Sequence, residues 1–456
     1  MSSQKPSIPK GTRDFDPSKM IRRNHIIEKI RATFQIYGFL PIETPSMENL
    51  SVLTGKYGEE GDKLIFKVLN SGDFLENVSE TDFNGGAKKL TSKIAEKALR
   101  YDLTVPFARY VVMNRNEISF PFKRYQIQPV WRADRPQKGR YREFVQCDAD
   151  VVGTDSLICE AEIVLMINEA LSALNIDFTI KINNRKILSG ITEVIGKAGS
   201  ETDLCVAIDK LDKIGKEGVI KELRERDFSE ESITKLIPII ESTGSAAEKI
   251  ATLKLALKDS ETGMKGIVEL EKTFDYLRSF GYTHNNYEFD ITLARGLSYY
   301  TGAIFEVKAN DVQIGSICGG GRYDNLTGVF GLPGVSGVGI SFGIDRIYDV
   351  LEEKKLFPAE NSSSTRVLIC PFDEETEKFS LPILKLLREA NINSELFPEP
   401  GKMKKQLTYA NNKSIPFTLL IGSDELKSGN LTLKNMQSGE QERLPIEAIV
   451  NKLKKA

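Results

Sequence analysis

The sequence of 456 residues predicts an α+β protein with more than one domain, since globular domains average about 150 residues. Three observations support this class. Two strand-like runs, 122–131 and 143–152, lie close enough in the chain to form an antiparallel hairpin. The stretch 183–280 is rich in Lys, Glu, Leu and Ile, which predicts helices. After residue 366, strand-like and helix-like segments alternate, which predicts a separate mixed α/β domain.

Further elements of the first part follow from local patterns. Apolar residues recur at helical spacing over 18–37, and Gly38 suits the end of that helix. Residues 62–69 resemble another strand, and 156–175 carry a second helical pattern. The glycine-rich stretch 315–346 predicts a strand that leads into a helix. Together these elements predict a largely antiparallel sheet with helices.

The domain boundaries follow from changes in composition. We expect a sheet domain in two parts, 1–180 and 284–358, interrupted by a helical insertion at 181–283. A short linker, 359–365, leads to the C-terminal domain, 366–456. An insertion is favoured over tandem domains because strand-like sequence returns after the helical stretch.

The composition excludes several kinds of function. The 62 Lys and Arg against 64 Asp and Glu give a net charge of −2, so no overall charge excess indicates a polyanionic partner. No apolar run is long enough for a membrane span, and the N-terminus lacks an apolar signal segment. Five dispersed cysteines without C-x-x-C indicate reduced thiols in a cytosolic protein. Two histidines cannot form a multi-histidine zinc site, and we predict no metal site built by the protein alone.

The loop between the two long strand-like runs is strongly basic. Its arginine side chains are suited to phosphate, because the planar guanidinium binds two oxygens at once and stays charged. The basic residues are Arg132, Arg135, Lys138, Arg140 and Arg142. A hairpin that directs these groups at a polyphosphate and a hairpin with a solvated tip are equally consistent with this pattern.

A second window, 98–111, carries a carboxylate close to a hydroxyl. Asp102 and Thr104 lie two residues apart, so in an extended segment both would project from one face and could bind an ammonium group. The alternative, which this window alone favours, is a turn or helix start before Pro106.

A third window, 289–307, places Arg295, Tyr299 and Tyr300 in strand-favouring sequence rather than in a loop. An arginine there either pairs with a buried acid or faces a ligand anion. The nearby GVGISFG lacks the G-x-G-x-x-G spacing of a dinucleotide loop, so a strand running into a helix that carries Arg346 is favoured.

Taken in order, these windows resemble the class II aminoacyl-tRNA synthetases, and within them the histidyl-tRNA synthetase family. PIETPSM resembles motif 1, VWRADRPQKGRYREF motif 2 and GVGISFGIDRI motif 3. PKGTRDF, ALRYDLTVPFARY, ARGLSYYTG and GGGRYD resemble elements of the histidine enzymes. The resemblance implies a catalytic domain on an antiparallel sheet with a helical insertion, and a C-terminal anticodon-binding domain. It also implies a homodimer, formed through motif 1.

The resemblance assigns roles to matching residues. Arg132 would hold the ATP α-phosphate and the amino acid's carboxylate, and Arg295 would stabilise charge at that phosphate, so both are expected to be catalytic. The expected histidine-binding residues are Asp102, Thr104, Arg132, Gln146, Asp150, Arg295, Tyr299 and Tyr300. The expected ATP-binding residues are Arg132, Asp134, Arg140, Phe144 and Arg346.

The histidine-binding set divides between the two ends of the amino acid. The α-ammonium group would be bound by Asp102, Thr104 and Gln146. The imidazole would contact Asp150 and Tyr300.

The ATP-binding set includes one departure from the family. Arg140 and Arg346 would grip the β- and γ-phosphates, while Arg346 and Phe144 would cover the two faces of adenine. Asp134 stands where an acid reads the adenine amino group, and it is one methylene shorter than the usual Glu. Elsewhere, Ser298 replaces a usual Asp, which changes the support of neighbouring site residues.

The implied reaction is the ATP-dependent ligation of L-histidine to tRNA(His) through histidyl-adenylate, in the cytoplasm. ATP is a substrate, and Mg²⁺ accompanies its phosphates. A non-catalytic regulatory subunit of histidine biosynthesis is one alternative, disfavoured by the intact arginines and by residues 366–456. A class II synthetase for another amino acid is a second, disfavoured by ARGLSYYTG.

Overall fold

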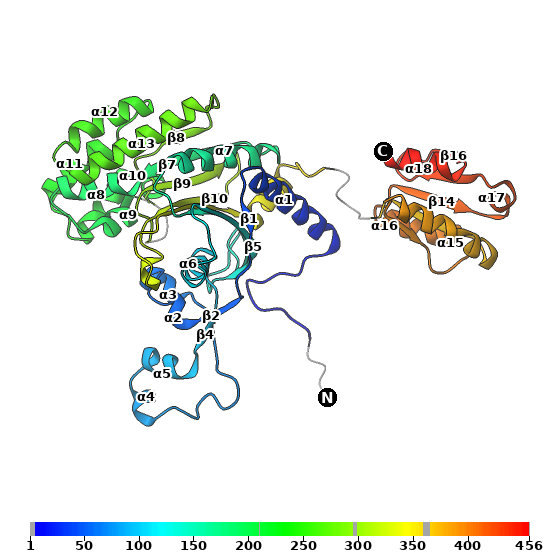
Figure 1. The fold of residues 1–456 in the computed structure, drawn as a ribbon, viewed down its shortest axis with the longest axis horizontal. Helices are drawn as coiled ribbons and strands as arrows, with labels where there is room; N and C mark the ends of the chain where they lie inside the picture. Colours follow the sequence, from blue (N-terminus) through cyan, green and yellow to red (C-terminus); the bar gives the residue numbers. More distant parts are fainter. Residues whose placement is uncertain (1–4, 209, 295–298, 359–364, 456) are drawn as a thin grey trace. The chain divides into compact units, whose positions relative to one another are not determined.

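The computed structural model describes residues 5–208, 210–294, 299–358 and 365–455 (Figure 1). The chain forms two compact units: residues 1–13 with 26–356, and residues 14–25 with 357–456. No helix in the described ranges is long and apolar enough to cross a membrane. The domain boundaries drawn from the sequence stay predictions.

The larger unit is built on an eight-stranded sheet in which neighbouring strands are antiparallel except at its two edges, where β1 pairs with β5 and β8 with β7 in parallel. This confirms the predicted fold class. In spatial order the strands are β1 (Leu40–Pro41), β5 (Phe122–Trp131), β6 (Glu143–Val152), β11 (Gly337–Gly343), β10 (Cys318–Tyr323), β9 (Ala303–Ala309), β7 (Phe178–Asn184) and β8 (Tyr287–Phe289).

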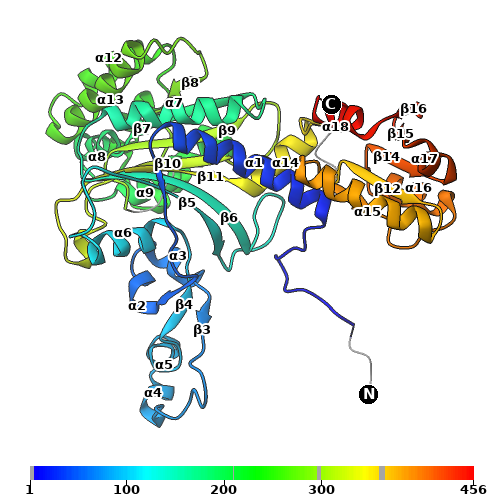
Figure 2. The same ribbon diagram turned by 45° about the vertical axis from the view of Figure 1, so that its right-hand side comes forward.

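Helices cover one face of this sheet, as Figure 2 shows. They are α7 (Ile158–Ser172), α14 (Ile344–Glu353) and, from Ile26 onward, α1 (Pro17–Ile36). Near the end of α1, Phe34 is fully buried, and its ring lies 5.6 Å from Tyr125 on β5 and 5.7 Å from Phe342 on β11. Burial of such aromatic rings against the sheet stabilises the packing of α1. The opposite face of these strands is thereby left for the cavity described below.

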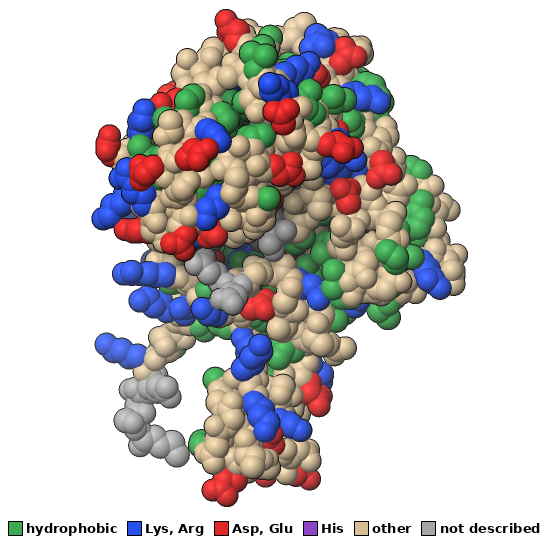
Figure 3. All heavy atoms as spheres, turned by 90° about the vertical axis from the view of Figure 1, so that its left-hand side faces the viewer, with side chains coloured by type: hydrophobic (Ala, Val, Ile, Leu, Met, Phe, Trp, Pro, Cys, Tyr) green, Lys and Arg blue, Asp and Glu red, His purple; other side chains and the backbone are tan. Residues whose placement is uncertain are grey.

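Six helices occupy the chain between the adjacent strands β7 and β8. They are α8 (Arg185–Val194), α9 (Glu201–Ile208), α10 (Leu211–Glu225), α11 (Glu230–Ile240), α12 (Ala246–Ala256) and α13 (Glu261–Ser279). Helices α8 and α13 pack closely where Gly190 meets Gly263. A Cβ atom on Gly190 would lie only 2.4 Å from the Cα atom of Gly263, so the close contact requires glycine. Figure 3 views the molecule from the side of these helices, whose surface carries interspersed acidic and basic side chains.

A second, three-stranded antiparallel sheet lies near the start of the chain. It contains β2 (Met47–Asn49), β4 (Lys97–Leu99) and β3 (Lys67–Val68), with the helices α2 (Leu50–Leu53), α3 (Gly58–Lys63), α4 (Glu80–Asn84) and α5 (Ala87–Ile94) nearby in sequence. In Figures 1 and 2, α4 and α5 lie at the far end of an arm that extends from this sheet. The predicted strand at 62–69 is wrong except at Lys67–Val68. The acidic GEEGDK segment forms α3 instead, since acidic residues favour helix N-termini.

Two further helical segments belong to this unit. Helix α6 (Thr104–Met113) is apolar on most of its faces and is largely buried, and η1 (Gly328–Phe330) is a short 3₁₀ turn. All five cysteines of the chain lie buried within the described ranges, and none forms a disulfide.

The C-terminal part of the chain has its own five-stranded sheet, which confirms the predicted mixed α/β domain. Its strands, in spatial order, are β13 (Ser394–Leu396), β12 (Val367–Pro371), β14 (Phe417–Ile421), β15 (Leu431–Asn435) and β16 (Gln441–Leu444). The first three are parallel and the last two antiparallel. The helices are α15 (Glu374–Glu389), α16 (Met403–Asn412), α17 (Ser423–Ser428) and α18 (Ile446–Lys455).

Candidate active site

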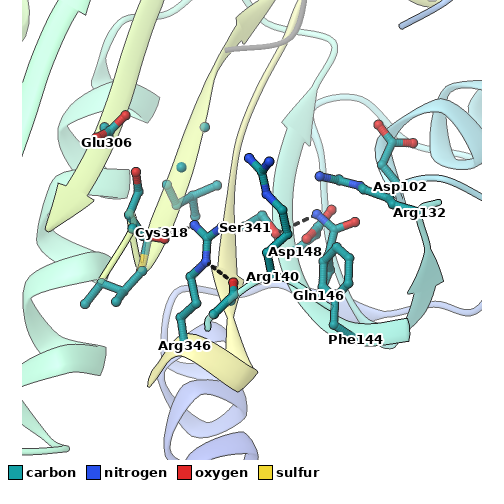
Figure 4. Close-up of a pocket in the computed structure, with 18 of the residues that line it drawn as sticks. Asp102, Arg132, Arg140, Phe144, Gln146, Asp148, Glu306, Cys318, Ser341 and Arg346 are labelled. Atoms are coloured by element: carbon teal, nitrogen blue, oxygen red, sulfur yellow. Dashed lines mark hydrogen bonds between the residues drawn. The ribbon is translucent and has the colours of Figure 1, made fainter. Parts of the chain in front are cut away.

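One large cavity opens on the antiparallel sheet, with a volume of about 1190 Å³ (Figure 4). Strands β6, β9, β10 and β11, the loop after β5 and the start of α14 all contribute to its wall. Of the twelve predicted site residues, the eleven that the structure describes all line it: Asp102, Thr104, Arg132, Asp134, Arg140, Phe144, Gln146, Asp150, Tyr299, Tyr300 and Arg346. The remaining residue, Arg295, lies outside the described residues, as does Ser298.

Asp102 lines the cavity from the segment just before α6. Its Oδ1 atom accepts hydrogen bonds from the Tyr57 hydroxyl at 2.9 Å and the Val105 backbone N–H at 3.1 Å. Burial raises the pKa of the Asp102 carboxyl, and these hydrogen bonds and nearby Arg132 act in the opposite direction. The carboxylate is therefore oriented before any ligand binds.

For the window 98–111, the sequence left two possibilities: an extended segment with Asp102 and Thr104 on one face, or a turn or helix start. The backbone at these residues is not extended. Thr104 is the first residue of α6, so the alternative of a helix start is correct. Pro106, in the first turn, favours this start because its fixed φ angle suits a helix and its missing N–H needs no partner there. Both side chains nevertheless reach the cavity.

Arg132 follows the last residue of β5 and is drawn on the same side of the cavity as Asp102 in Figure 4. Its Nε–H donates to the Tyr101 carbonyl at 3.0 Å, and its guanidinium carbon lies 4.3 Å from the centre of the Tyr101 ring. Its terminal nitrogens have no hydrogen-bond partner among the described residues, so they can bind an anion. Arg132 is thus held by one nitrogen and open at the other two.

A second group of cations lies toward α14. Arg346 donates from Nε to the Gly139 carbonyl at 2.8 Å and from Nη1 to the Ser316 carbonyl at 2.7 Å. Arg140 is looser, since its Nη1 atom lies 3.8 Å from Asp134 Oδ1 and its side chain is 49% exposed. Arg132, Arg140 and Arg346 together give the cavity a concentration of positive charge that suits a polyphosphate.

A buried ion pair lies behind the cavity wall at Asp150. Arg124 on β5 and Asp150 on β6 are cross-strand neighbours, and Arg124 Nη2 lies 2.8 Å from Asp150 Oδ2. The Tyr323 hydroxyl donates to Asp150 Oδ1 at 2.7 Å. Neither Arg124 nor Tyr323 was among the predicted site residues, although Tyr323 belongs to the GGGRYD element. The sequence signal that could have indicated Arg124 is a charged residue within the predicted strand 122–131.

The turn before β9 supplies two tyrosines. Tyr299 donates from its hydroxyl to Asp102 Oδ2 at 3.2 Å, and its ring lies edge-on to that of Tyr300 at 5.1 Å. The prediction that these tyrosines fall in a strand is wrong, because β9 begins only at Ala303. A turn forms there instead, and the Thr301 hydroxyl donates a hydrogen bond of 2.6 Å to Asp324, just after β10.

Glycines form the floor of the cavity between β6 and β10. A Cβ atom on Gly339 would lie 2.0 Å from Asp150 Oδ1, and one on Gly320 would lie 2.1 Å from the Gly339 carbonyl oxygen. Neither position can carry a side chain without displacing its neighbour. The glycine-rich sequence therefore serves close strand packing beneath the cavity rather than a phosphate-binding loop.

The fold and the cavity together define a class II aminoacyl-tRNA synthetase, with an arginine-lined antiparallel sheet and a separate C-terminal mixed α/β domain. A family model described as Histidyl-tRNA synthetase matches residues 73–347. A second, described as Anticodon binding domain, matches residues 366–456.

Individual relatives agree with these matches. A histidine–tRNA ligase of Cytophaga hutchinsonii is 64% identical over 451 residues, which cover 99% of this chain and 100% of the relative. A histidine–tRNA ligase of Bacteroides fragilis is 59% identical over 452 residues, covering 99% of each. The crystal structure of histidyl-tRNA synthetase from Nostoc sp. PCC 7120 has a TM-score of 0.85 at 31% identity, covering 99% of this chain and 100% of that one. The chain belongs to the histidyl-tRNA synthetase family.

Membership of this family confirms the predicted class of enzyme. The chain is an ATP-dependent aminoacyl-tRNA synthetase. The two alternatives, a non-catalytic subunit and a synthetase for another amino acid, find no support among these relatives.

Proposed function

We propose that this enzyme ligates L-histidine to tRNA(His) in two steps within the cavity. The histidine carboxylate attacks the α-phosphorus of ATP and forms histidyl-adenylate and diphosphate. A terminal ribose hydroxyl of the tRNA then attacks the histidyl carbonyl and releases AMP. The observation that carries this proposal is the meeting, in one cavity, of buried carboxylates with three arginines, of which Arg132 acts on the Asp102 carboxylate and Arg140 and Arg346 lie toward α14.

The buried end is suited to the amino acid. Asp102 and Gln146 offer oxygens, and Thr104 a hydroxyl, to the α-ammonium group. Asp150 and Tyr300 line the deeper part, where the imidazole would lie. An amino acid without an imidazole would leave such buried polar groups unpaired, which typically costs about 1–3 kcal/mol per group.

The arginine end is suited to ATP. Arg132 would bind the α-phosphate and the histidine carboxylate, so that it joins the two substrates, while Arg140 and Arg346 would bind the β- and γ-phosphates. Arg346 and Phe144 would also cover the adenine faces, and Asp134 would accept from its amino group. The step needs no nucleophilic side chain, because positioning and charge neutralisation supply most of the catalysis. Arg295 keeps its expected role at the α-phosphate as part of this proposal.

Mg²⁺ would enter with the ATP phosphates. Within the described ranges, no group of three or more His, Cys, Asp or Glu side chains is arranged to hold a metal ion. Mg²⁺ commonly binds through substrate phosphates, water and one or two carboxylates, and the Glu306 carboxylate lies in the cavity wall. The ion would neutralise charge on the phosphates.

The proposal extends to the whole assembly. The C-terminal domain, 366–456, would read the anticodon of tRNA(His). A homodimer would form through the segment 41–47, where Met47 at the end is 52% exposed and Leu40, just before the start, is 60% exposed. We expect the enzyme in the cytoplasm, where thiols stay reduced.

Exchange of labelled diphosphate into ATP tests this function. We expect exchange that depends on L-histidine and does not rise with threonine, proline or glycine. The variant Asp155→Asn, on an exposed loop outside the cavity, is a matched control and should exchange like wild type. Absence of histidine-dependent exchange in folded protein would remove the proposal, and faster exchange with another amino acid would change its substrate.

A further inference from the structure

Asp148 lies in the wall of the cavity but has no role in the functions assigned above. It is on β6, two residues from both Gln146 and Asp150, so all three side chains project from the same face of the strand. All three line the cavity, and Figure 4 shows Asp148 beside Gln146. Asp148 is 2% exposed, so its carboxyl is almost fully removed from water.

The hydrogen bonds around Asp148 leave one of its oxygens without a partner. Gln146 donates from Nε2 to the Ser341 hydroxyl oxygen at 2.9 Å, and the nearby Ser341 hydroxyl lowers the pKa of the Asp148 carboxyl. This arrangement leaves Asp148 Oδ1 and Gln146 Oε1 buried without a hydrogen-bond partner in the described part of the chain. Buried polar atoms are normally paired, so two unpaired acceptors in a cavity wall indicate a ligand with N–H donors.

The neighbouring Asp150 is already engaged. Arg124 lies 2.8 Å from its Oδ2 and the Tyr323 hydroxyl donates to its Oδ1, so each oxygen has a partner. Arg124 also makes only long contacts, at 3.4 Å, with Gln126 and the Leu103 carbonyl. One guanidinium therefore pairs with Asp150 while a second buried carboxyl, Asp148, stays nearby without an ion pair of its own.

We propose that Asp148 determines specificity for histidine by accepting, at Oδ1, a hydrogen bond from a ring N–H of the bound imidazole. This inference rests on the proposed function. Along β6, Asp148 lies between Gln146, which would face the α-ammonium group, and the engaged Asp150. A ring that enters beyond the ammonium site meets Asp148 Oδ1 as its open acceptor. Ser341 acts as a positioning residue, because its hydroxyl holds the Gln146 amide and lies near the Asp148 carboxyl.

The protonation of Asp148 agrees with this geometry. Burial raises the pKa of Asp148 to about 7, against the lowering effect of Arg124 and with a further rise from Asp150. A carboxyl with a pKa near that of an imidazole can share a proton with it, which favours a strong hydrogen bond.

The variant Asp148→Asn tests the proposal, since it keeps the shape and removes the charged acceptor. In diphosphate exchange we expect the KM for histidine to rise roughly 10- to 100-fold, the loss of one charge-assisted hydrogen bond, with the KM for ATP unchanged. Ser341→Ala should raise the same KM less, by roughly 3- to 10-fold. Asp155→Asn should leave both unchanged.

A deaminated analogue separates the ring from the ammonium group. Imidazole-4-propionate keeps the ring and lacks the α-ammonium, so its inhibition constant should weaken in Asp148→Asn by the same factor as the KM for histidine. Weakening for histidine alone would assign Asp148 to the ammonium group and overturn the proposal. An unchanged KM for histidine would also overturn it.

Two further results keep the tests separate. If Asp148→Asn fails to fold, judged by its circular dichroism, the decision falls to Ser341→Ala, and an unchanged KM for histidine there overturns the proposal. Wild-type protein without histidine-dependent exchange would sink the proposed function itself. Active wild type with unaffected variants would sink only the role of Asp148.

Discussion

The two ends of the cavity are built in different ways. At the amino-acid end, Asp102 and Asp150 are 1% and 3% exposed, and each is held by two or more hydrogen bonds or ion pairs. At the nucleotide end, Arg140 is on a loop, is 49% exposed and approaches its nearest acid only to 3.8 Å. The amino-acid end is formed before the substrate arrives, whereas Arg140 at the nucleotide end can adjust to it.

This difference fits what each end must do. A small amino acid is selected by a few fixed polar groups, and fixed groups discriminate best when they lose much by remaining unpaired. Phosphates are highly charged and are gripped by long side chains whose ordering accompanies binding. Four changes test this comparison, from the largest expected effect to the smallest.

Arg132 belongs to both ends, so its loss should have the largest effect. Arg132→Ala should lower kcat/KM for diphosphate exchange by roughly 10³-fold or more, because it removes charge stabilisation at the α-phosphate and a contact with the carboxylate. Steady-state exchange measures this effect, and unchanged thermal unfolding checks the fold. A loss below tenfold would contradict a joining role for Arg132.

The buried ion pair supports the amino-acid end. Arg124→Met should lower the free energy of unfolding by about 3 kcal/mol or more, because it leaves Asp150 buried without its partner. Urea denaturation measures this loss. Adding Asp150→Asn to the same chain should restore most of the stability, since no uncompensated charge then remains. Equal instability of the single and double variants would show that the pair is not the cause.

The amino-acid end should also make stability depend on pH. Because the pKa of Asp148 is raised to about 7 in the folded state, the fold binds a proton that the unfolded chain loses near its ordinary value. The stability that Asp148 contributes is thus full below about pH 4 and is lost as the pH rises to about 7. Relative to Asp148→Asn, wild type should lose on the order of 1 kcal/mol of stability for each pH unit over this range in denaturation curves. Parallel curves for the two proteins would argue against the raised pKa.

The nucleotide end should tolerate change better. Arg140→Ala should raise the KM for ATP by about tenfold and leave the KM for histidine unchanged, since its side chain is partly solvated and poorly anchored. The effect should shrink at high salt, where exposed charges are screened. If the KM for histidine rose equally, the two ends would not be separate.

The sequence predicted the framework of the site well because its signals are local. The strands 122–131 and 143–152 coincide with β5 and β6, and residues chosen from motif resemblance lie around one cavity. Partners across strands were missed, since Arg124 meets Asp150 only through the pairing register of β5 and β6. The pattern of residues within one strand does not determine which residues of the next strand lie opposite.

Other misses have different physical causes. Tyr299 is strand-favouring by type, but hydrogen bonds between Thr301 and residues at the end of β10 impose a turn. In the C-terminal domain, α17 and β16 carry only weak sequence signals, because α17 has only six residues and the β16 sequence, QERL, is polar and mostly exposed. Short or polar elements depend on the surroundings that the complete fold provides.

The glycine floor has a consequence for changing the substrate. At Gly320 and Gly339 the base of the cavity is bare backbone, so mutation can only add atoms there and make the space shallower. A bigger amino acid would have to gain its room from the tyrosine walls, at Tyr300 or Tyr323, where side chains can be trimmed. Over these two glycines the depth of the site is therefore already at its maximum, and room there can be gained only from the neighbouring side chains.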